Sequence, residues 1–323
     1  MRRIKDIVVP ASFFGIILGL VGLGNCWRVA SRLWALPTWP GESIMLGATL
    51  VWALLILLYA AKWLWLPQEG QAEYRHPVLC CFIGLAPVSS SLIAVAIRPY
   101  APEAAWLLAL ASIIGTLAFG VWRTGQLWTG GRDPAATTPV LYLPTTGGSF
   151  VCVITLSTFG HQDWAWPFFG MGLLSWLAIE SVLWHRLYTA AEMSPPLRPT
   201  LGIQLAPPVV GCAAYLAMTG GPPDLFAKAL FGYGVLQVLI LLRLLPWIGK
   251  NGFAPGFWGF TFGISAMPLS ALRFVERGDD GPIAAAAPWL FGAANLLIGG
   301  IAIGTLILLA RGKLLPPRLV PPS

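Results

Sequence analysis

The sequence predicts an all-α polytopic membrane protein of ten transmembrane helices, which form five helical hairpins around a central pore. Of its 323 residues, 57% are hydrophobic and only 10% are charged, whereas an average soluble domain carries about 25% charged residues. The apolar residues occur in runs of about 20, the length that an α-helix needs to cross a hydrocarbon core of about 30 Å. Proline and glycine interrupt every second run, which predicts two kinds of helix.

Proline, glycine and charged residues divide the chain into ten apolar segments, which we expect to form one transmembrane domain over residues 1–323. The expected spans are 9–34, 43–66, 78–98, 104–128, 139–160, 164–188, 200–219, 226–247, 256–274 and 283–310. The start, MRRIKDIVV, resembles the first region of a signal peptide, but the apolar run that follows is too long and lacks a cleavage site. We therefore expect this first span to be retained.

The basic residues predict the orientation of the chain in the lipid bilayer. With a cytoplasmic amino terminus, 14 of the 20 Lys and Arg residues fall on the cytoplasmic side and 6 on the other. Cytoplasmic loops favour Lys and Arg, so we expect both termini in the cytoplasm. The basic residues are scattered at span ends, so the net charge of +7 indicates membrane orientation and no nucleic-acid partner.

Helix-breaking residues concentrate in the odd-numbered segments, where the markers are Gly15, Pro87, Pro144, Pro207 and Pro268. Proline removes a backbone donor and displaces the carbonyl one turn earlier. A membrane helix tolerates this only where protein or water can satisfy the freed groups. We therefore expect the odd-numbered segments to form an inner layer around a pore or substrate pathway, with the even-numbered segments facing lipid. Kinked helices that simply pack together are the alternative.

The residues that carry enzyme chemistry are almost absent from the predicted spans. The five cysteines lie in apolar runs without a C-x-x-C pair, and the three histidines lie at span ends. We therefore predict no catalytic residues, no metal site and no cofactor. Glu180 is the clearest acid within a span; we expect an ion pair with Arg123 or Arg243, with a proton relay as the alternative. The predicted central helices carry essentially no charge, which argues against a cation pore.

Six ordered motifs carry a resemblance to a known family: FFGIILGLVGLGNCWR at 13–28, EYRHPVL at 73–79, TTPVLYLPT at 138–146, LGIQLAPPVV at 201–210, LFGYGVLQVLILLRLLPW at 230–247 and FWGFTFGISA at 257–266. The chain resembles the tellurite-resistance/dicarboxylate transporter family, to which plant slow-type anion channels are distantly related. The resemblance covers nearly the whole chain. It implies a homotrimer in the cell inner (plasma) membrane, with a pore through each protomer.

The resemblance also implies a pore that is closed by a phenylalanine in the ninth span. That motif corresponds to Thr261, Phe262 and Gly263, so Phe262 is the candidate gate, and Gly15 would lie across the pore from it. The candidate pore-lining or kink residues are Gly15, Pro87, Pro144, Pro207 and Gly263. The chain departs from the family pattern at Gly147 and Gly148, where asparagine is usual, at Ser181, where proline is frequent, and at Pro268, where proline is not expected.

These observations favour an anion channel-like transport protein for small inorganic anions, linked to tellurite resistance by the resemblance. A proton-coupled carrier for tellurite or dicarboxylates is the alternative, and it would depend on Glu180. A scaffold that transports nothing is the third hypothesis.

Overall fold

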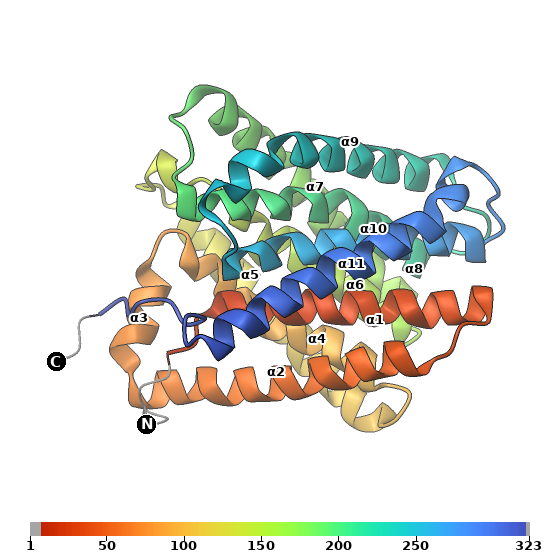
Figure 1. Cartoon of the computed structure of the whole chain (residues 1–323), viewed down its shortest axis with the longest axis horizontal. Helices are drawn as coiled ribbons and strands as arrows, with labels where there is room; N and C mark the ends of the chain where they lie inside the picture. The colour runs from red at the N-terminus through yellow and green to blue at the C-terminus, as the bar shows by residue number, and fades with distance from the viewer. Residues whose placement is uncertain (1–7, 321–323) are drawn as a thin grey trace.

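Long helices run side by side along nearly one direction in the computed structural model (Figure 1). The structure describes residues 8–320, and within this range it contains helices and loops but no strands. Nine helices within this range are long and apolar enough to cross a membrane. The segment predicted as the ninth span is also helical, as α10 (Trp258–Glu276), but it is not one of these nine. The all-helical membrane fold is confirmed, whereas the count of ten spans stays a prediction.

Five helices form an outer layer: α2 (Trp39–Trp65), α5 (Pro102–Trp128), α7 (Gln162–Thr189), α9 (Leu225–Ile248) and α11 (Pro282–Ala310). Within these spans only 17% to 33% of the residues in the most apolar stretch are buried. Leu54, Leu177 and Leu239 are 55%, 54% and 59% exposed. Apolar side chains that remain exposed over whole helices indicate a surface in contact with lipid.

The inner layer contains the odd-numbered predicted segments, and each begins with turns that are not α-helical. The inner segments are η2 (Ala11–Phe14) with α1 (Gly15–Trp34), η3 (Leu79–Gly84) with α4 (Leu85–Ile97), η5 (Pro139–Tyr142) and η6 (Leu143–Gly147) with α6 (Gly148–Thr158), η7 (Pro195–Leu205) with α8 (Ala206–Met218), and η9 (Pro255–Phe257) with α10. In the first four segments 67% to 83% of the most apolar stretch is buried, and in α10 twelve of 19 residues are buried. The predicted division into two layers is therefore confirmed.

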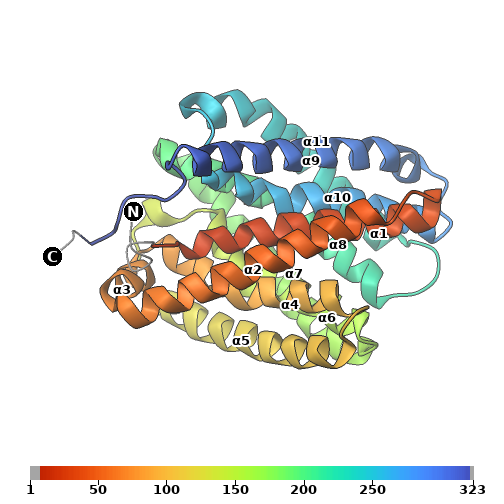
Figure 2. The ribbon, with the colours of Figure 1, turned by 60° about the horizontal axis from the view of Figure 1, so that its bottom comes forward.

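The five inner helices form a closed ring. Helix α1 contacts α4, α4 contacts α6, α6 contacts α8, α8 contacts α10, and α10 returns to α1. Each inner helix also packs against the outer helix that follows it in the sequence, which gives five hairpins. Figure 2 shows α5 and α11 on opposite sides of the inner helices. The prolines of the inner segments lie inside this arrangement, because Pro144, Pro207 and Pro268 are buried and Pro87 is half-buried.

Glycines allow the first and last inner helices to approach closely. A Cβ atom on Gly19 would lie 2.2 Å from Thr261 Oγ1, and one on Gly22 would lie 2.1 Å from Ser265 Oγ. Both distances are far below van der Waals contact, so any larger residue at these two positions of α1 would force Thr261 or Ser265 to shift. This contact closes the ring between its first and last members.

Both ends of the described chain lie at the same end of the bundle, beside the short helix α3 (Pro67–Arg75), which the sequence analysis did not predict. Glu73 of α3 accepts a hydrogen bond from the backbone N–H of Ala11 at 2.8 Å. Glu69 accepts hydrogen bonds from the backbone N–H groups of Leu319 and Val320. The remaining short elements are η4 (Pro134–Ala136) and η8 (Gly249–Asn251).

Candidate functional site

A small cavity of about 50 Å³ lies between the inner helices. All five inner segments contribute to its wall: Ser12, Gly15, Leu18, Phe82, Leu85, Val88, Tyr142, Leu143, Thr146, Gly147, Gly148, Phe150, Ile203, Ala206, Pro207, Val210, Trp258, Gly259 and Phe262. Many of these residues belong to the 3₁₀ and π turns at which the inner segments begin. Irregular backbone at membrane depth is tolerated where it is buried in protein or lines a cavity, and both conditions hold here.

Three of the six candidate gate, pore-lining or kink residues lie in the wall of this cavity: Gly15, Pro207 and Phe262. Gly147 and Gly148, where the chain departs from the family pattern, also lie in the wall. Phe262 is half-buried, as a side chain that faces a cavity should be, and it packs against the apolar core. A Cβ atom on Gly15 would lie 4.0 Å from the nearest atoms of Leu85 and Trp258. The wall at Gly15 therefore has space beside it that a larger side chain would fill.

The other three predicted residues do not line the cavity. Pro87 lies against Gly115 of α5, because a Cβ atom added to Gly115 would be 3.3 Å from Pro87 Cβ. The carbonyl of Pro144 would be 2.6 Å from a Cβ on Gly120. Gly263 faces η7, because its added Cβ would lie 2.7 Å from Leu205 Cγ. These positions set the close approach of helices around the cavity.

The cavity wall is apolar apart from a few hydroxyl groups. The Oγ1 atom of Thr146 is buried and has no hydrogen-bond partner among the described residues. Tyr142 is also in the wall, but its hydroxyl group donates to Glu180 on α7. Thr146 thus contributes to the wall while its own hydroxyl is a buried group without a hydrogen-bond partner among the described residues, which the sequence analysis did not identify.

The ion pair expected for Glu180 is wrong. Its carboxylate accepts hydrogen bonds from five neutral donors: Tyr142 Oη, Trp176 Nε1 at 3.0 Å, Trp184 Nε1 at 2.8 Å, Tyr233 Oη at 2.6 Å and Gln237 Nε2 at 3.4 Å. Neither Arg123 nor Arg243 is among its partners in the described range. Aromatic O–H and N–H groups supply the hydrogen bonds that a cation was expected to supply, and they join α7 and α9 to the cavity wall.

A second cavity, of about 230 Å³, opens between the inner helices at the end of the bundle opposite Ala11. Arg28 and Arg32 of α1, Arg98 after α4 and Arg273 of α10 line it, and we call these four residues and their cavity the arginine vestibule. On α1, Arg28 lies ten residues beyond Leu18 of the central cavity, or about 15 Å at 1.5 Å per residue. The vestibule is thus a separate chamber on the same axis.

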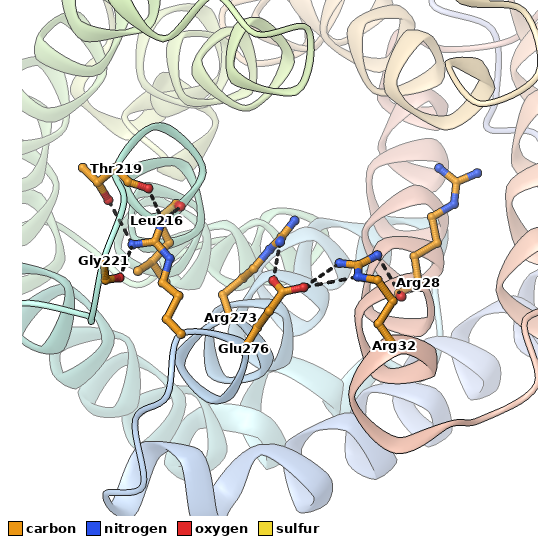
Figure 3. A network of polar contacts seen from close by, with 8 residues as sticks. Arg28, Arg32, Leu216, Thr219, Gly221, Arg273 and Glu276 are labelled. Atoms are coloured by element: carbon orange, nitrogen blue, oxygen red, sulfur yellow. Dashed lines mark hydrogen bonds and ion pairs between the residues drawn. The ribbon is translucent and has the colours of Figure 1, made fainter.

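Two carboxylates partly neutralise the arginine vestibule. Arg28 binds Glu42 through two hydrogen bonds of 2.7 Å each. Glu276 bridges Arg32, at 2.9 Å, and Arg273. Figure 3 shows this bridge between α10 and α1, with the Arg28 side chain one turn before Arg32 on α1. Arg98 has no carboxylate partner among the described residues, and its guanidinium lies 5.6 Å from the ring centre of Phe159. Four arginines thus face two acids, which leaves two positive charges in excess.

Arg277 holds the neighbouring loop beside the arginine vestibule. It donates hydrogen bonds to the carbonyl groups of Leu216, Thr219 and Gly221, and also to the hydroxyl of Thr219. Figure 3 labels these three acceptor residues. Burial lowers the pKa of this guanidinium from its ordinary value. Residues 8–320 contain no group of three or more His, Cys, Asp or Glu side chains that could hold a metal ion.

Comparisons of the sequence with known proteins identify its family. The family model described as "Voltage-dependent anion channel" (SLAC1) matches residues 8–306. The chain is 34% identical over 314 residues to the "Tellurite resistance protein TehA homolog" of Haemophilus influenzae, which covers 97% of this chain and 94% of that protein. It is 20% identical to the "S-type anion channel SLAH3" and 21% identical to the "Guard cell S-type anion channel SLAC1", both of Arabidopsis thaliana.

The plant proteins are longer. The matches cover 92% of this chain but only 48% and 55% of the two plant channels. The family model, in contrast, extends over all five inner helices and therefore over both cavities. The chain belongs to the SLAC1/TehA family of helical membrane channels and transporters.

Proposed function

We propose that the protein is an anion channel whose pore follows the axis of the inner ring and is held closed by Phe262. The observation that supports this proposal most directly is the position of Phe262 in the wall of a cavity to which all five inner helices contribute. Membership of the family supports an anion as the transported species. The wall of the cavity contains no Asp or Glu side chain, so it lacks the acidic ring that favours cations in many channels.

The closed state follows from the size and polarity of the central cavity. A buried water needs about 10–15 Å³ measured in this way, so a cavity of about 50 Å³ has room for only a few. An anion that entered it would lose most of its hydration, and the mostly apolar wall offers few donors to replace the lost water. Burying a charge without partners is strongly unfavourable, and an apolar constriction also expels water. The phenyl ring strengthens both barriers.

The test is the current through purified protein in planar bilayers before and after Phe262→Ala. The substitution removes the ring from the cavity wall, so we expect a conductance at least tenfold higher, with Phe262→Leu intermediate. Nitrate and iodide should pass more readily than chloride, because they lose hydration more easily. Phe260→Ala is the matched control, since Phe260 is buried on the same helix against Gly202 and does not line the cavity.

Two results would contradict the proposal. If the folded Phe262→Ala protein conducts no more than wild type, Phe262 is a packing residue. If flux saturates and follows the proton gradient, the protein is a carrier for anions such as tellurite or dicarboxylates.

Tellurite resistance, assembly and membrane orientation are the subjects of wider proposals. One relative is named for tellurite resistance, and we propose a link to tellurite resistance here. We also propose a homotrimer in the inner (plasma) membrane, with a pore in each protomer and both termini in the cytoplasm. The mass of the detergent-solubilised protein tests the trimer, because a monomer or dimer would contradict it. Labelling of single cysteines at the two ends, from each side of the membrane, tests the orientation.

A further inference from the structure

The charge and the free donors of the arginine vestibule are not explained by packing alone. Of its four arginines, Arg28 and Arg32 use their side-chain donors on Glu42, Glu276 and backbone carbonyls. Arg273 uses Nη1 on Glu276, and no hydrogen bond from its Nε or Nη2 atom occurs in the described range. The side-chain donors of Arg98 likewise have no acceptor there. The unpaired nitrogen atoms of Arg273 are not buried, and Arg98 is an exposed residue, so both side chains are accessible to a ligand.

The vestibule combines these donors with an apolar floor. Its other lining residues are Asn25, Val29, Val95, Pro99, Ile154, Thr158, Ala213, Ala217 and Leu269. Apart from Asn25 and Thr158 they are apolar, so the arginines are the main groups that can bind a polar solute. At about 230 Å³ the vestibule is more than four times as large as the central cavity, at about 50 Å³. A small anion can therefore enter it with much of its hydration shell.

We infer that the arginine vestibule is a binding site for small oxyanions, with Arg98 and Arg273 as its principal ligands. A guanidinium is a planar fork whose parallel N–H groups match two oxygens of one anion, whereas a halide is a single point. Arg98 follows α4 and Arg273 lies on α10, so the site exists only when the ring is closed. The role of this site is to concentrate anions at one mouth of the pore, and this role rests on the proposed channel function.

We expect weak binding of anions in the vestibule, because its two principal ligands are exposed to water. Arg98 is exposed, and the Arg273 side chain is 38% exposed, so water screens both charges and each contributes little. Weak binding suits a mouth through which ions must also leave, because a tightly held anion would block conduction. The vestibule therefore raises the local concentration of oxyanions without trapping them.

The main experiment measures current through the Phe262→Ala protein in planar bilayers, with nitrate or chloride added on the vestibule side only. Arg98→Gln should raise the half-saturating nitrate concentration roughly two- to fivefold, which is the range for one exposed charge contact. Arg273→Gln should have an effect of similar size. Arg98→Lys keeps the charge but not the planar fork of N–H groups. It should therefore restore the half-saturating concentration of chloride more fully than that of nitrate. Arg311→Gln, an exposed arginine after α11, is the matched control and should leave both values unchanged.

The outcomes separate this inference from the proposed function. Binding is also measured in the closed wild-type protein, as the nitrate-dependent change in unfolding temperature relative to chloride at equal ionic strength. If Phe262→Ala fails to conduct but Arg98→Gln abolishes the nitrate-dependent change, the site stands and the channel proposal falls. If Phe262→Ala conducts and Arg98→Gln changes neither measurement, the vestibule is no binding site. If Arg98→Lys fully restores the half-saturating nitrate concentration of the parent protein, the vestibule attracts anions only by its charge. That result would overturn the assignment to oxyanions.

Discussion

Replacing one partner of the buried ion pair between Lys62 and Glu73 should be among the most destabilising single substitutions in the protein. The two side chains are 1% and 3% exposed, and Lys62 Nζ lies 2.6 Å from Glu73 Oε2. Glu73 also accepts from the Tyr59 hydroxyl at 3.0 Å and from Ala11 N–H, while Lys62 donates to the carbonyl of Val9 at 2.9 Å. The pair thus fastens α2 and α3 to the start of the first inner helix.

Removing one partner leaves the other charge buried without compensation. Lys62→Met should therefore cost about 3–5 kcal/mol of the free energy of unfolding, and Glu73→Gln a similar amount. The double variant removes both charges and should cost several kcal/mol less than the sum of the single costs. Arg32→Gln breaks the exposed pair with Glu276, in which Arg32 is 55% exposed. This control should cost less than about 1 kcal/mol.

The assay is reversible unfolding in mixed micelles with increasing dodecyl sulfate, followed by the fluorescence of the 16 tryptophans. All four variants and wild type are compared at the same pH and lipid content. Costs for Lys62→Met and Glu73→Gln below about 1 kcal/mol, or strictly additive costs in the double variant, would refute the argument. Water would then have to reach the pair and replace each lost partner.

Three further predictions address packing, pH and the carboxylate of α7. Gly22→Ala should cost about 1–3 kcal/mol of stability through overpacking, and Ser265→Gly in the same chain should recover part of it in the unfolding assay, because the new Cβ meets Ser265. Burial lowers the pKa of His76 below its ordinary 6.5, so stability should fall as pH drops from 6.5 through that lowered value, and His76→Gln should flatten this dependence in thermal unfolding. Glu180→Gln should cost about 1–3 kcal/mol of the free energy of unfolding, because donors such as the Tyr142 hydroxyl lose an acceptor. The anion current of this variant should remain independent of a proton gradient. A proton-driven flux in wild type that disappears in the variant would contradict the channel proposal.

The architecture could be predicted from the sequence because bilayer physics restricts where helix breakers occur. Pro144, Pro207 and Pro268 marked inner segments, and all three are buried. The same logic did not place each marker at the cavity, since a proline in an inner helix can face the axis, as Pro207 does, or a neighbouring helix, as Pro87 does. Both positions satisfy the freed backbone groups, so sequence pattern alone does not separate them.

The arginine vestibule could not be predicted, because its residues are distant in sequence and resemble ordinary residues at span ends. Arg28, Arg98 and Arg273 each follow an apolar run, where basic residues are also expected for orientation in the membrane. Only closure of the ring brings them around one cavity. The Glu180 prediction was wrong for a related reason: tryptophan and tyrosine donors near a span look like interfacial anchors until their direction is known.

The contact between α1 and α10 has a consequence for biogenesis. The chain is synthesised from the end that carries Gly19 and Gly22. The glycine face of α1 therefore lacks its packing partner, α10, while three further hairpins are inserted into the membrane. Until α10 emerges, the nascent protein is an open trough that lacks both its last wall and the phenyl ring of Phe262. A nonsense or frameshift mutation before Trp258 removes both α10 and α11, so the product keeps the glycine face of α1 without Thr261 and Ser265 to pack against it.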